Sequence, residues 1–133
     1  MPTFDDSTEC AASPEDVWLT LYDPLRFPEW WTGIESAVSG DELGGDADIT
    51  IYPDGYPDFP MPQLVQSRTD DLRVTVTCTV SELAFDWRLE PVDTGTRISV
   101  HVEIPESEAH RLATQQSVIS SSLRRLAEVA SHG

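Results

Sequence analysis

The chain has 133 residues and is strongly acidic: 24 Asp and Glu residues outnumber 8 basic ones, which gives a formal net charge of −16. A charge of this sign repels phosphate groups, so we expect neither nucleic acid nor an anionic membrane surface as a partner. No apolar stretch approaches the roughly 18 residues that a membrane span needs. The acidic start MPTFDDSTEC lacks the layout of a secretory signal. The length therefore predicts a single domain over residues 1–133, which we expect to be cytoplasmic.

The two cysteines and three histidines are scattered along the chain. Cys10 and Cys78 fall on two different predicted strands. Such isolated cysteines are more often buried small hydrophobic residues than a disulfide or a metal pair. A zinc site needs about four converging ligands, and the histidines have no ligand-like spacing with either cysteine. We therefore expect neither a metal nor a cofactor.

The N-terminal part of the chain predicts a strand followed by two short helices. The strand is expected over residues 3–11. Residues 13–16 (Ser-Pro-Glu-Asp) are typical of a helix start, because serine caps the first turn, proline fits it and acids favour its dipole. This helix is expected to end at Asp23-Pro24, since the residue before proline avoids helical geometry. A second short helix is expected over residues 24–31, up to Thr32-Gly33.

The middle of the chain predicts three strands and one stiff loop. The strands are expected at residues 34–39, 46–52 and 63–69. Between the last two, residues 53–62 (PDGYPDFPMP) hold four of the ten prolines, which supply no ladder hydrogen bond. Loops held by a rigid scaffold often carry function. Tyr56 and Phe59 in this loop are therefore candidates for gating a binding site.

Three segments near the C-terminus alternate strictly between apolar and polar residues. Because successive side chains of a strand point to opposite faces, this pattern predicts a half-buried antiparallel sheet with an apolar inner face. A turn at Asp93-Thr94-Gly95 connects the last two strands. Cys78 supplies the only ionisable group on this face. The inner-face residues are Leu72, Val74, Val76, Cys78 and Val80; Leu83, Phe85, Trp87 and Leu89; and Ile98, Val100, Val102 and Ile104.

The last segment, residues 105–131, predicts the longest helix of the chain. Its apolar residues fall on one stripe at helical spacing. Gln116 and Ser120 interrupt that stripe with polar side chains. We therefore expect the first half of the helix to face something other than a packed core.

This order of elements, together with three local motifs, resembles the START/birch-pollen-allergen-like (SRPBCC) superfamily, and within it the polyketide cyclase/dehydrase-like branch. The first motif is the Ala-Ser-Pro-Glu-Asp-Val-Trp segment of residues 12–18. The second is Phe-Pro-Glu-Trp-Trp at residues 27–31. The third is Leu89-Glu90-Pro91 followed by Gly95-Thr96-Arg97. The resemblance covers nearly the whole chain.

The resemblance implies an α+β helix-grip fold. A curved antiparallel sheet of seven predicted strands would surround the long C-terminal helix, with two short helices after the first strand. A cavity would lie between the sheet and the helix. Family members bind lipids, sterols, polyketides or plant hormones, some cyclise or dehydrate polyketides, and others help partners to fold. The family therefore predicts a pocket more firmly than a reaction.

Candidate ligand contacts follow from combining the apolar inner face with the implied cavity. Trp87 and Phe85 are interpreted either as a stacking platform for a ligand or as core residues. Trp31 belongs to a motif that packs the second helix under the sheet. The full candidate set is Trp87, Phe85, Val74, Val76, Cys78, Val100, Gln116, Ser120, Trp31, Tyr56 and Phe59.

Two main hypotheses for the function remain open at this point. The first is binding of a small hydrophobic or aromatic molecule. The second is a cyclase- or dehydrase-like reaction in the same cavity, for which no catalytic residue can be named from spacing. An acid such as Glu29 or Asp54 could still reach the cavity from a helix or loop. A structural or partner-binding role is the third alternative, and the sequence does not indicate an oligomeric state.

Overall fold

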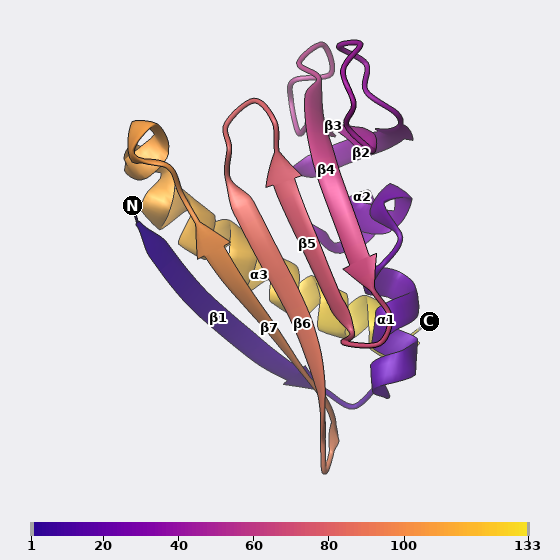
Figure 1. Ribbon diagram of the computed structural model, residues 1–133. Coiled ribbons are helices and arrows are strands. Elements are labelled where there is room, and N and C mark those ends of the chain that lie inside the picture. The colour runs from indigo at the N-terminus through magenta and orange to yellow at the C-terminus, as the bar shows by residue number, and fades with distance from the viewer. Residues whose placement is uncertain (1, 133) are drawn as a thin grey trace.

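The computed structural model describes residues 2–132, in which a twisted antiparallel sheet packs against a long C-terminal helix (Figure 1). The strands are β1 (Thr3–Cys10), β2 (Ile34–Ser39), β3 (Ile49–Pro53), β4 (Met61–Arg68), β5 (Arg73–Cys78), β6 (Ala84–Val92) and β7 (Gly95–Glu103). The helices are α1 (Pro14–Leu21), α2 (Phe27–Trp30) and α3 (Leu112–His132), with short 3₁₀ segments η1 (Pro24–Arg26) and η2 (Glu106–Arg111).

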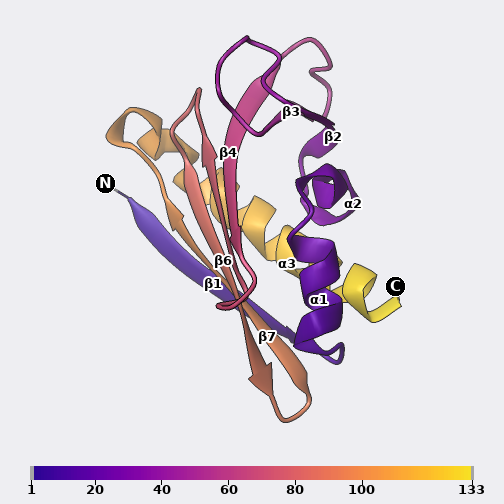
Figure 2. The same ribbon diagram turned by 45° about the vertical axis from the view of Figure 1, so that its right-hand side comes forward.

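The seven strands form one sheet in the order β1-β7-β6-β5-β4-β3-β2. Every neighbouring pair is antiparallel. The three helices all lie on one side of this sheet, with α3 running across it and α1 and α2 beside α3 (Figure 2). The expected α+β helix-grip fold is therefore confirmed. Within residues 2–132, no helix combines the length and the apolar character that crossing a membrane requires.

The start of α1 follows the sequence prediction closely. Ser13 is the N-cap, and its Oγ accepts a hydrogen bond of 3.2 Å from the backbone N–H of Asp16. At the other end, α1 ends at Leu21, slightly before the predicted Asp23-Pro24. Asp23 instead caps η1, because its Oδ1 accepts a hydrogen bond from the N–H of Leu25 at 3.0 Å. The two short helices therefore have the predicted order, and the second begins as a 3₁₀ turn.

The alternating segments form the centre of the sheet, and their apolar residues face α3 as predicted. Val74, Trp87 and Ile98 have no exposed surface, and Phe85 is 8% exposed. The predicted 72–80 strand is too long, however, because β5 ends at Cys78. There the N–H of Cys78 bonds to the carbonyl of Leu83 and closes the hairpin, which leaves Val80 in the turn and 50% exposed.

The predicted 105–131 helix is also too long at its start. Residues 106–111 form η2, in which the N–H of Glu108 bonds to the carbonyl of Pro105, three residues back, at 2.8 Å. The α-helical hydrogen-bond pattern begins only at Leu112. The tighter 3₁₀ segment matters for the site below, because Arg111 is its last residue.

Candidate ligand-binding pocket

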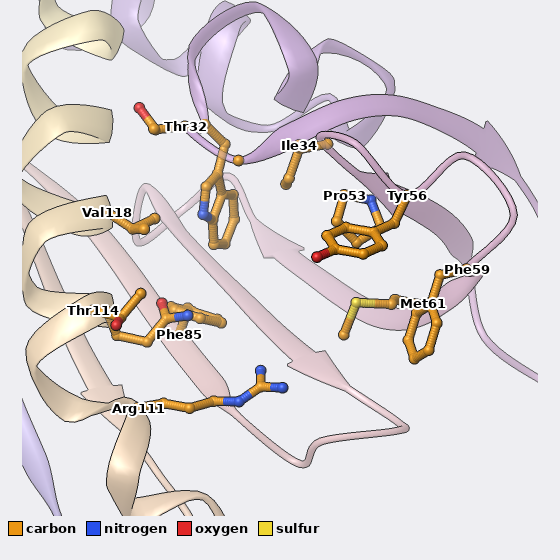
Figure 3. A pocket seen from close by; sticks show the side chains of 13 residues that line it. Thr32, Ile34, Pro53, Tyr56, Phe59, Met61, Phe85, Arg111, Thr114 and Val118 are labelled. Atoms are coloured by element: carbon orange, nitrogen blue, oxygen red, sulfur yellow. The ribbon is translucent and has the colours of Figure 1, made fainter.

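A pocket of about 580 Å³ opens between the sheet and the first half of α3 (Figure 3). Its walls come from the junction of α2 and β2, the loop between β3 and β4, strand β6 and the α3 side. The lining residues are Trp31, Thr32, Gly33, Ile34, Pro53, Tyr56, Phe59, Met61, Phe85, Arg111, Thr114, Gln115 and Val118.

The inner wall of the pocket is aromatic. Trp31 and Phe85 meet edge to face, with ring centroids 4.9 Å apart and an interplanar angle of 84°. Trp31 is held in place by its backbone, because its N–H bonds to the carbonyl of Phe27 at 2.7 Å and ends the short helix α2. Behind this wall, Trp87 packs against Trp31 at 5.1 Å. The wall is therefore supported by a rigid aromatic cluster.

Hydrogen bonds tie the α2–β2 junction to α3 and so fix the width of the pocket at this point. The N–H of Thr32 donates to Ser122 Oγ at 2.9 Å, and Thr32 Oγ1 donates to Ser121 Oγ at 2.9 Å. Ser122 in turn donates to the carbonyl of Val118 at 2.7 Å, which satisfies its hydroxyl. Farther along α3, Arg125 Nη2 donates to the carbonyl of Glu29 at 2.8 Å. Because these hydrogen bonds hold the α2–β2 junction against α3, the spacing between these two walls of the pocket is set by the fold.

The outer rim of the pocket is the proline-rich loop. Tyr56 and Phe59 lie in this loop and are 65% and 53% exposed. The loop is anchored to the α2–β2 junction by the N–H of Asp54, which donates to the carbonyl of Gly33 at 2.9 Å. Gly33 has a φ of +95°, a conformation that glycine adopts without steric cost. Next to it, a bulge between Ile34 and Ser36 begins β2, and such bulges redirect side chains.

The α3 side of the pocket supplies its polar groups. Arg111, Thr114 and Gln115 line it there, and the Oε1 atom of Gln115 is buried without a hydrogen-bond partner. Arg111 forms an ion pair through Nε with Glu108 Oε2 at 3.2 Å. Figure 3 shows the Arg111 side chain reaching from the helix towards the open space of the pocket. The pocket thus has apolar walls and one polar flank.

The structure places four of the sequence-predicted residues in the pocket lining: Trp31, Tyr56, Phe59 and Phe85. Five others on the inner face of the sheet lie in the packed interior instead and do not line the pocket. They are Trp87, Val74, Val76, Cys78 and Val100, none of which is more than 3% exposed. Trp30 and Trp31 cover Trp87, with ring centroids 5.0 and 5.1 Å away. Of the two interpretations of Trp87, a stacking platform for a ligand or a core residue, the structure therefore supports the core residue, whereas Trp31 and Phe85 line the pocket.

The expectation that Gln116 and Ser120 face the cavity is wrong. Both side chains are exposed, and neither lines the pocket. Each residue turns an α-helix by about 100°, so Gln116 points well away from its neighbour Gln115. The apolar stripe located the buried side of α3 correctly, but it did not tell which flank of that side meets the pocket.

Arg111, Gln115 and Val118 are pocket residues that sequence reasoning missed. Their spacing of four and then three residues is the signal that could have found them, because it marks one side of a helix. The two acids considered as possible cavity residues lie elsewhere. Glu29 and Asp54 are exposed and outside the pocket lining. Hydrogen bonds from Arg26 are the main cause that lowers the pKa of the Glu29 carboxyl.

A curved antiparallel sheet that grips a C-terminal helix, with a pocket between them, defines the helix-grip class of proteins. The chain belongs to the family of polyketide cyclases/dehydrases and lipid transport proteins, whose sequence model matches residues 1–131. This match confirms the resemblance to the polyketide cyclase/dehydrase-like branch of the SRPBCC superfamily. No curated protein matches the chain.

Solved structures of similar fold include proteins with quite different descriptions. The Zhui aromatase/cyclase from Streptomyces sp. R1128 has a TM-score of 0.79 at 13% identity, over 98% of this chain and 93% of that one. A START superfamily protein from Mycobacterium smegmatis has a TM-score of 0.73 at 12% identity, over 98% and 97%. The di-domain aromatase/cyclase BexL has a TM-score of 0.78 at 15% identity, over 96% of this chain. The chain spans only 46% of BexL. Sequence identities of 12%, 13% and 15% show that these proteins share a fold with the chain, and no more than that.

Proposed function

We propose that this protein binds a small hydrophobic or aromatic molecule in the pocket between the sheet and α3. The observation that carries the proposal is a pocket already open in the fold, with Trp31 and Phe85 as one wall and the loop with Tyr56 and Phe59 as the rim. Small-molecule sites are typically preformed, mostly apolar clefts of about 300–1,000 Å³ with a few placed polar groups. The volume of about 580 Å³ and the polar α3 flank fit that description.

The family supports this proposal without identifying the ligand. Its description joins polyketide cyclases and dehydrases with lipid transport, and these activities share an apolar ligand held inside the fold. In this chain the walls offer apolar and aromatic surface, whose burial stabilises a complex by about 25 cal/mol per Å². We infer that most of the binding free energy comes from this burial, and that the polar flank orients the ligand.

A cyclase- or dehydrase-like reaction in the same pocket is the second candidate. The structural similarity to two aromatase/cyclases favours it. So do two polar side chains in the lining, Tyr56 and Arg111. General acid–base catalysis requires a titratable group within hydrogen-bonding reach of the reacting atoms, and the phenol of Tyr56 is such a group. Arg111 stays protonated and would instead stabilise negative charge on a reacting oxygen. These two residues are the first to replace if the protein transforms a ligand.

Binding can be tested with the neutral fluorescent dye N-phenyl-1-naphthylamine, whose emission rises in an apolar environment. We expect saturable binding to the native protein. Val118→Trp places an indole on the helical wall of the pocket and should weaken dye binding at least tenfold. Thr114→Trp does the same from an exposed position of the lining, so a folding defect in the first variant leaves the second informative.

The matched control is Ser120→Trp, because Ser120 lies on α3 but outside the pocket lining. It adds the same side chain to the same helix and should leave dye binding within about twofold of the wild type. Circular dichroism reports whether each variant is folded. Equal loss of binding in Ser120→Trp and Thr114→Trp, or no binding by the native protein, would overturn the proposal.

A further inference from the structure

We propose that the pocket selects an organic anion: a ligand with an apolar or aromatic body and an acidic group that contacts Arg111. This inference rests on the proposed function and adds to it the charge of the ligand. Arg111 is the one charged side chain in the pocket lining formed by residues 2–132. Although the chain has a net charge of −16, the polar α3 flank of the pocket presents a cation and not a carboxylate.

The guanidinium of Arg111 is only partly engaged by the protein. Its Nε lies 3.2 Å from Glu108 Oε2, and Glu108 is the one acid within residues 2–132 that forms an ion pair with it. The side chain is 40% exposed and extends into the pocket opening (Figure 3). The planar guanidinium presents its donors in a fixed fork that matches the paired oxygens of an acid. Arg111 can therefore keep Glu108 on one edge and bind a ligand oxygen on another.

Gln115 adds a second polar group one helical turn from Arg111. Residues four apart on a helix lie about 5–6 Å from each other between Cβ atoms. The Oε1 atom of Gln115 is buried without a partner, and buried polar atoms in native proteins are rarely left unpaired. Half a turn of the amide exchanges its oxygen for its nitrogen, so Gln115 can donate a hydrogen bond to the same anion. A ligand at this flank satisfies both side chains at once.

Apart from Glu108, which contacts Arg111, the carboxylates on distant parts of the surface oppose the binding of an anion only at long range. The Debye length at physiological salt is about 8 Å, so carboxylates elsewhere on the surface are largely screened. Glu108 is the acid in direct contact with Arg111, and it is also paired with His110 at 3.7 Å. The contact between Arg111 and a bound acid is short and partly shielded from water by the ligand itself. The local attraction therefore dominates.

Two dyes with the same ring system separate this inference from the proposed function. N-phenyl-1-naphthylamine is neutral, and 1-anilinonaphthalene-8-sulfonate carries one sulfonate. Arg111→Gln should weaken binding of the anionic dye about three- to tenfold and binding of the neutral dye less than twofold. Arg124→Gln removes the same charge from an exposed position of α3 outside the pocket and should change neither dye by more than about twofold.

Two further variants move the affinity in opposite directions. Glu108→Gln removes the carboxylate that competes for Arg111. It should strengthen binding of the anionic dye about two- to threefold. Gln115→Glu is isosteric and adds a negative charge one turn from Arg111. It should therefore weaken binding of the anionic dye at least fivefold. The neutral dye should respond to both by less than about twofold.

The possible results distinguish failure of this inference from failure of the proposed function. Binding of the neutral dye with no selective effect of Arg111→Gln on the anionic dye would overturn the inference and leave the proposed function standing. Equal weakening of both dyes by Arg111→Gln would also overturn it, because Arg111 would then act on the shape of the pocket. Failure of both dyes to bind the native protein would remove the proposed function itself.

Discussion

The two faces of the β-sheet are built from the same strands by opposite chemistry. On the inner face, Val74, Trp87 and Val102 have no exposed surface and pack under α3 and the short helices. On the outer face, Arg88 and Arg97 have side chains that are 58% and 45% exposed. The inner face therefore gains its stability from removal of apolar surface from water, and the outer face from contacts between charged groups in water.

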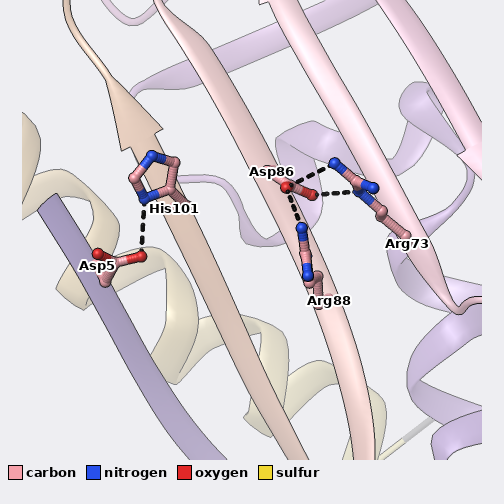
Figure 4. Close-up of polar contacts among 5 residues, drawn as sticks. All are labelled: Asp5, Arg73, Asp86, Arg88 and His101. Atoms are coloured by element: carbon pink, nitrogen blue, oxygen red, sulfur yellow. Dashed lines mark hydrogen bonds and ion pairs between the residues drawn. The ribbon is translucent and has the colours of Figure 1, made fainter. Parts of the chain in front are cut away.

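The outer face carries polar side-chain pairs on four neighbouring strands, β5 and β6, and β7 and β1 (Figure 4). Asp86 on β6 accepts hydrogen bonds from Arg73 Nε at 2.9 Å, Arg73 Nη2 at 3.0 Å and Arg88 Nη2 at 3.0 Å. In the next pair of strands, His101 Nδ1 and Asp5 Oδ1 lie 2.8 Å apart. Opposite charges on adjacent strands stabilise a sheet modestly, by roughly 0.2–1 kcal/mol for each pair.

This contrast shows where a binding function can arise. Along most of the inner face, aromatic and aliphatic side chains fill the space under the helices. At Phe85 the filling stops and the pocket begins. The proposed binding function is thus confined to the part of the apolar face that the protein does not cover with its own side chains. The contrast also predicts that the two faces respond differently to substitution, pH and salt.

The largest expected effect is on the inner face. Trp87→Ala removes a fully buried indole at the centre of the aromatic cluster and should lower the free energy of unfolding by about 3–5 kcal/mol. Urea unfolding measures the change. Because the lost contacts are apolar, the difference from the wild type should be the same at pH 7 and pH 5.

Two controls sharpen this result. Trp87→Phe keeps an aromatic ring and removes Nε1, a buried donor without a hydrogen-bond partner, so it should cost much less than the alanine variant. Tyr56→Ala removes a ring that is 65% exposed at the pocket rim, so it should stay within about 0.5 kcal/mol of the wild type. An equal cost for Trp87→Ala and Tyr56→Ala would contradict the division between packed interior and open pocket.

A smaller and pH-dependent effect is expected on the outer face. Burial alone would raise the pKa of the Asp86 carboxyl, but hydrogen bonds from Arg88 and Arg73 outweigh it and hold that pKa below its ordinary value of 3.8. A group with a lowered pKa in the folded state stabilises the protein above the unfolded-state pKa. This contribution disappears as the pH falls through the folded-state pKa. Asp86→Asn should therefore cost about 1 kcal/mol at pH 7, since both arginines are partly exposed and water screens the pairs.

The measurement is urea unfolding of the wild type and Asp86→Asn at several pH values. The difference between them should be constant from pH 7 to about pH 5, should begin to shrink near the ordinary pKa of 3.8, and should disappear only as the pH falls through the lower folded-state pKa. Glu35→Gln serves as a control, because Glu35 is an exposed acid on β2; its effect should be small throughout. A difference for Asp86→Asn that does not shrink at all between pH 5 and the lowest pH at which both proteins fold would show that the packing of this side chain matters more than its charge.

The assignment of residues to the two faces could be predicted from the sequence almost completely. Strict alternation within β5, within β6 and within β7 fixes which side chains point inward, because the period of a strand is two residues. The capped start of α1 and a turn at Asp93-Thr94-Gly95 likewise follow from local rules. The turn is one residue shorter than predicted, because Gly95 already pairs with Val92 as the first residue of β7. Each of these features depends on interactions between near neighbours in the chain.

The position of the pocket could not be predicted in the same way. Periodicity shows that Phe85 and Trp87 share a face, but only the position of Trp30 and Trp31 decides that Trp87 is covered and that Phe85 reaches the pocket. On α3, which of Gln115 and Gln116 faces the pocket depends on the orientation of the helix about its axis, and therefore on where the helix begins. The short 3₁₀ segment before Leu112 sets that point. These are long-range packing decisions, which no short sequence window contains.

The smallest expected effect concerns the excess of carboxylates, which are concentrated on the surface rather than on the inner face. At a net charge of −16, repulsion between them opposes the compact state. Raising the salt from 0.1 M to 1 M shortens the Debye length from about 10 Å to about 3 Å. This weakens the repulsion more than the few exposed ion pairs. We expect Tm in sodium chloride to rise by about 2–3 °C, which corresponds to roughly 0.5 kcal/mol for a domain of this size.

A variant with Glu35, Glu90 and Glu128 replaced by glutamine loses three exposed negative charges and should show a shallower rise. A flat or falling curve for the wild type would mean that the outer-face pairs already offset the repulsion, because screening them would then cost as much as it gains.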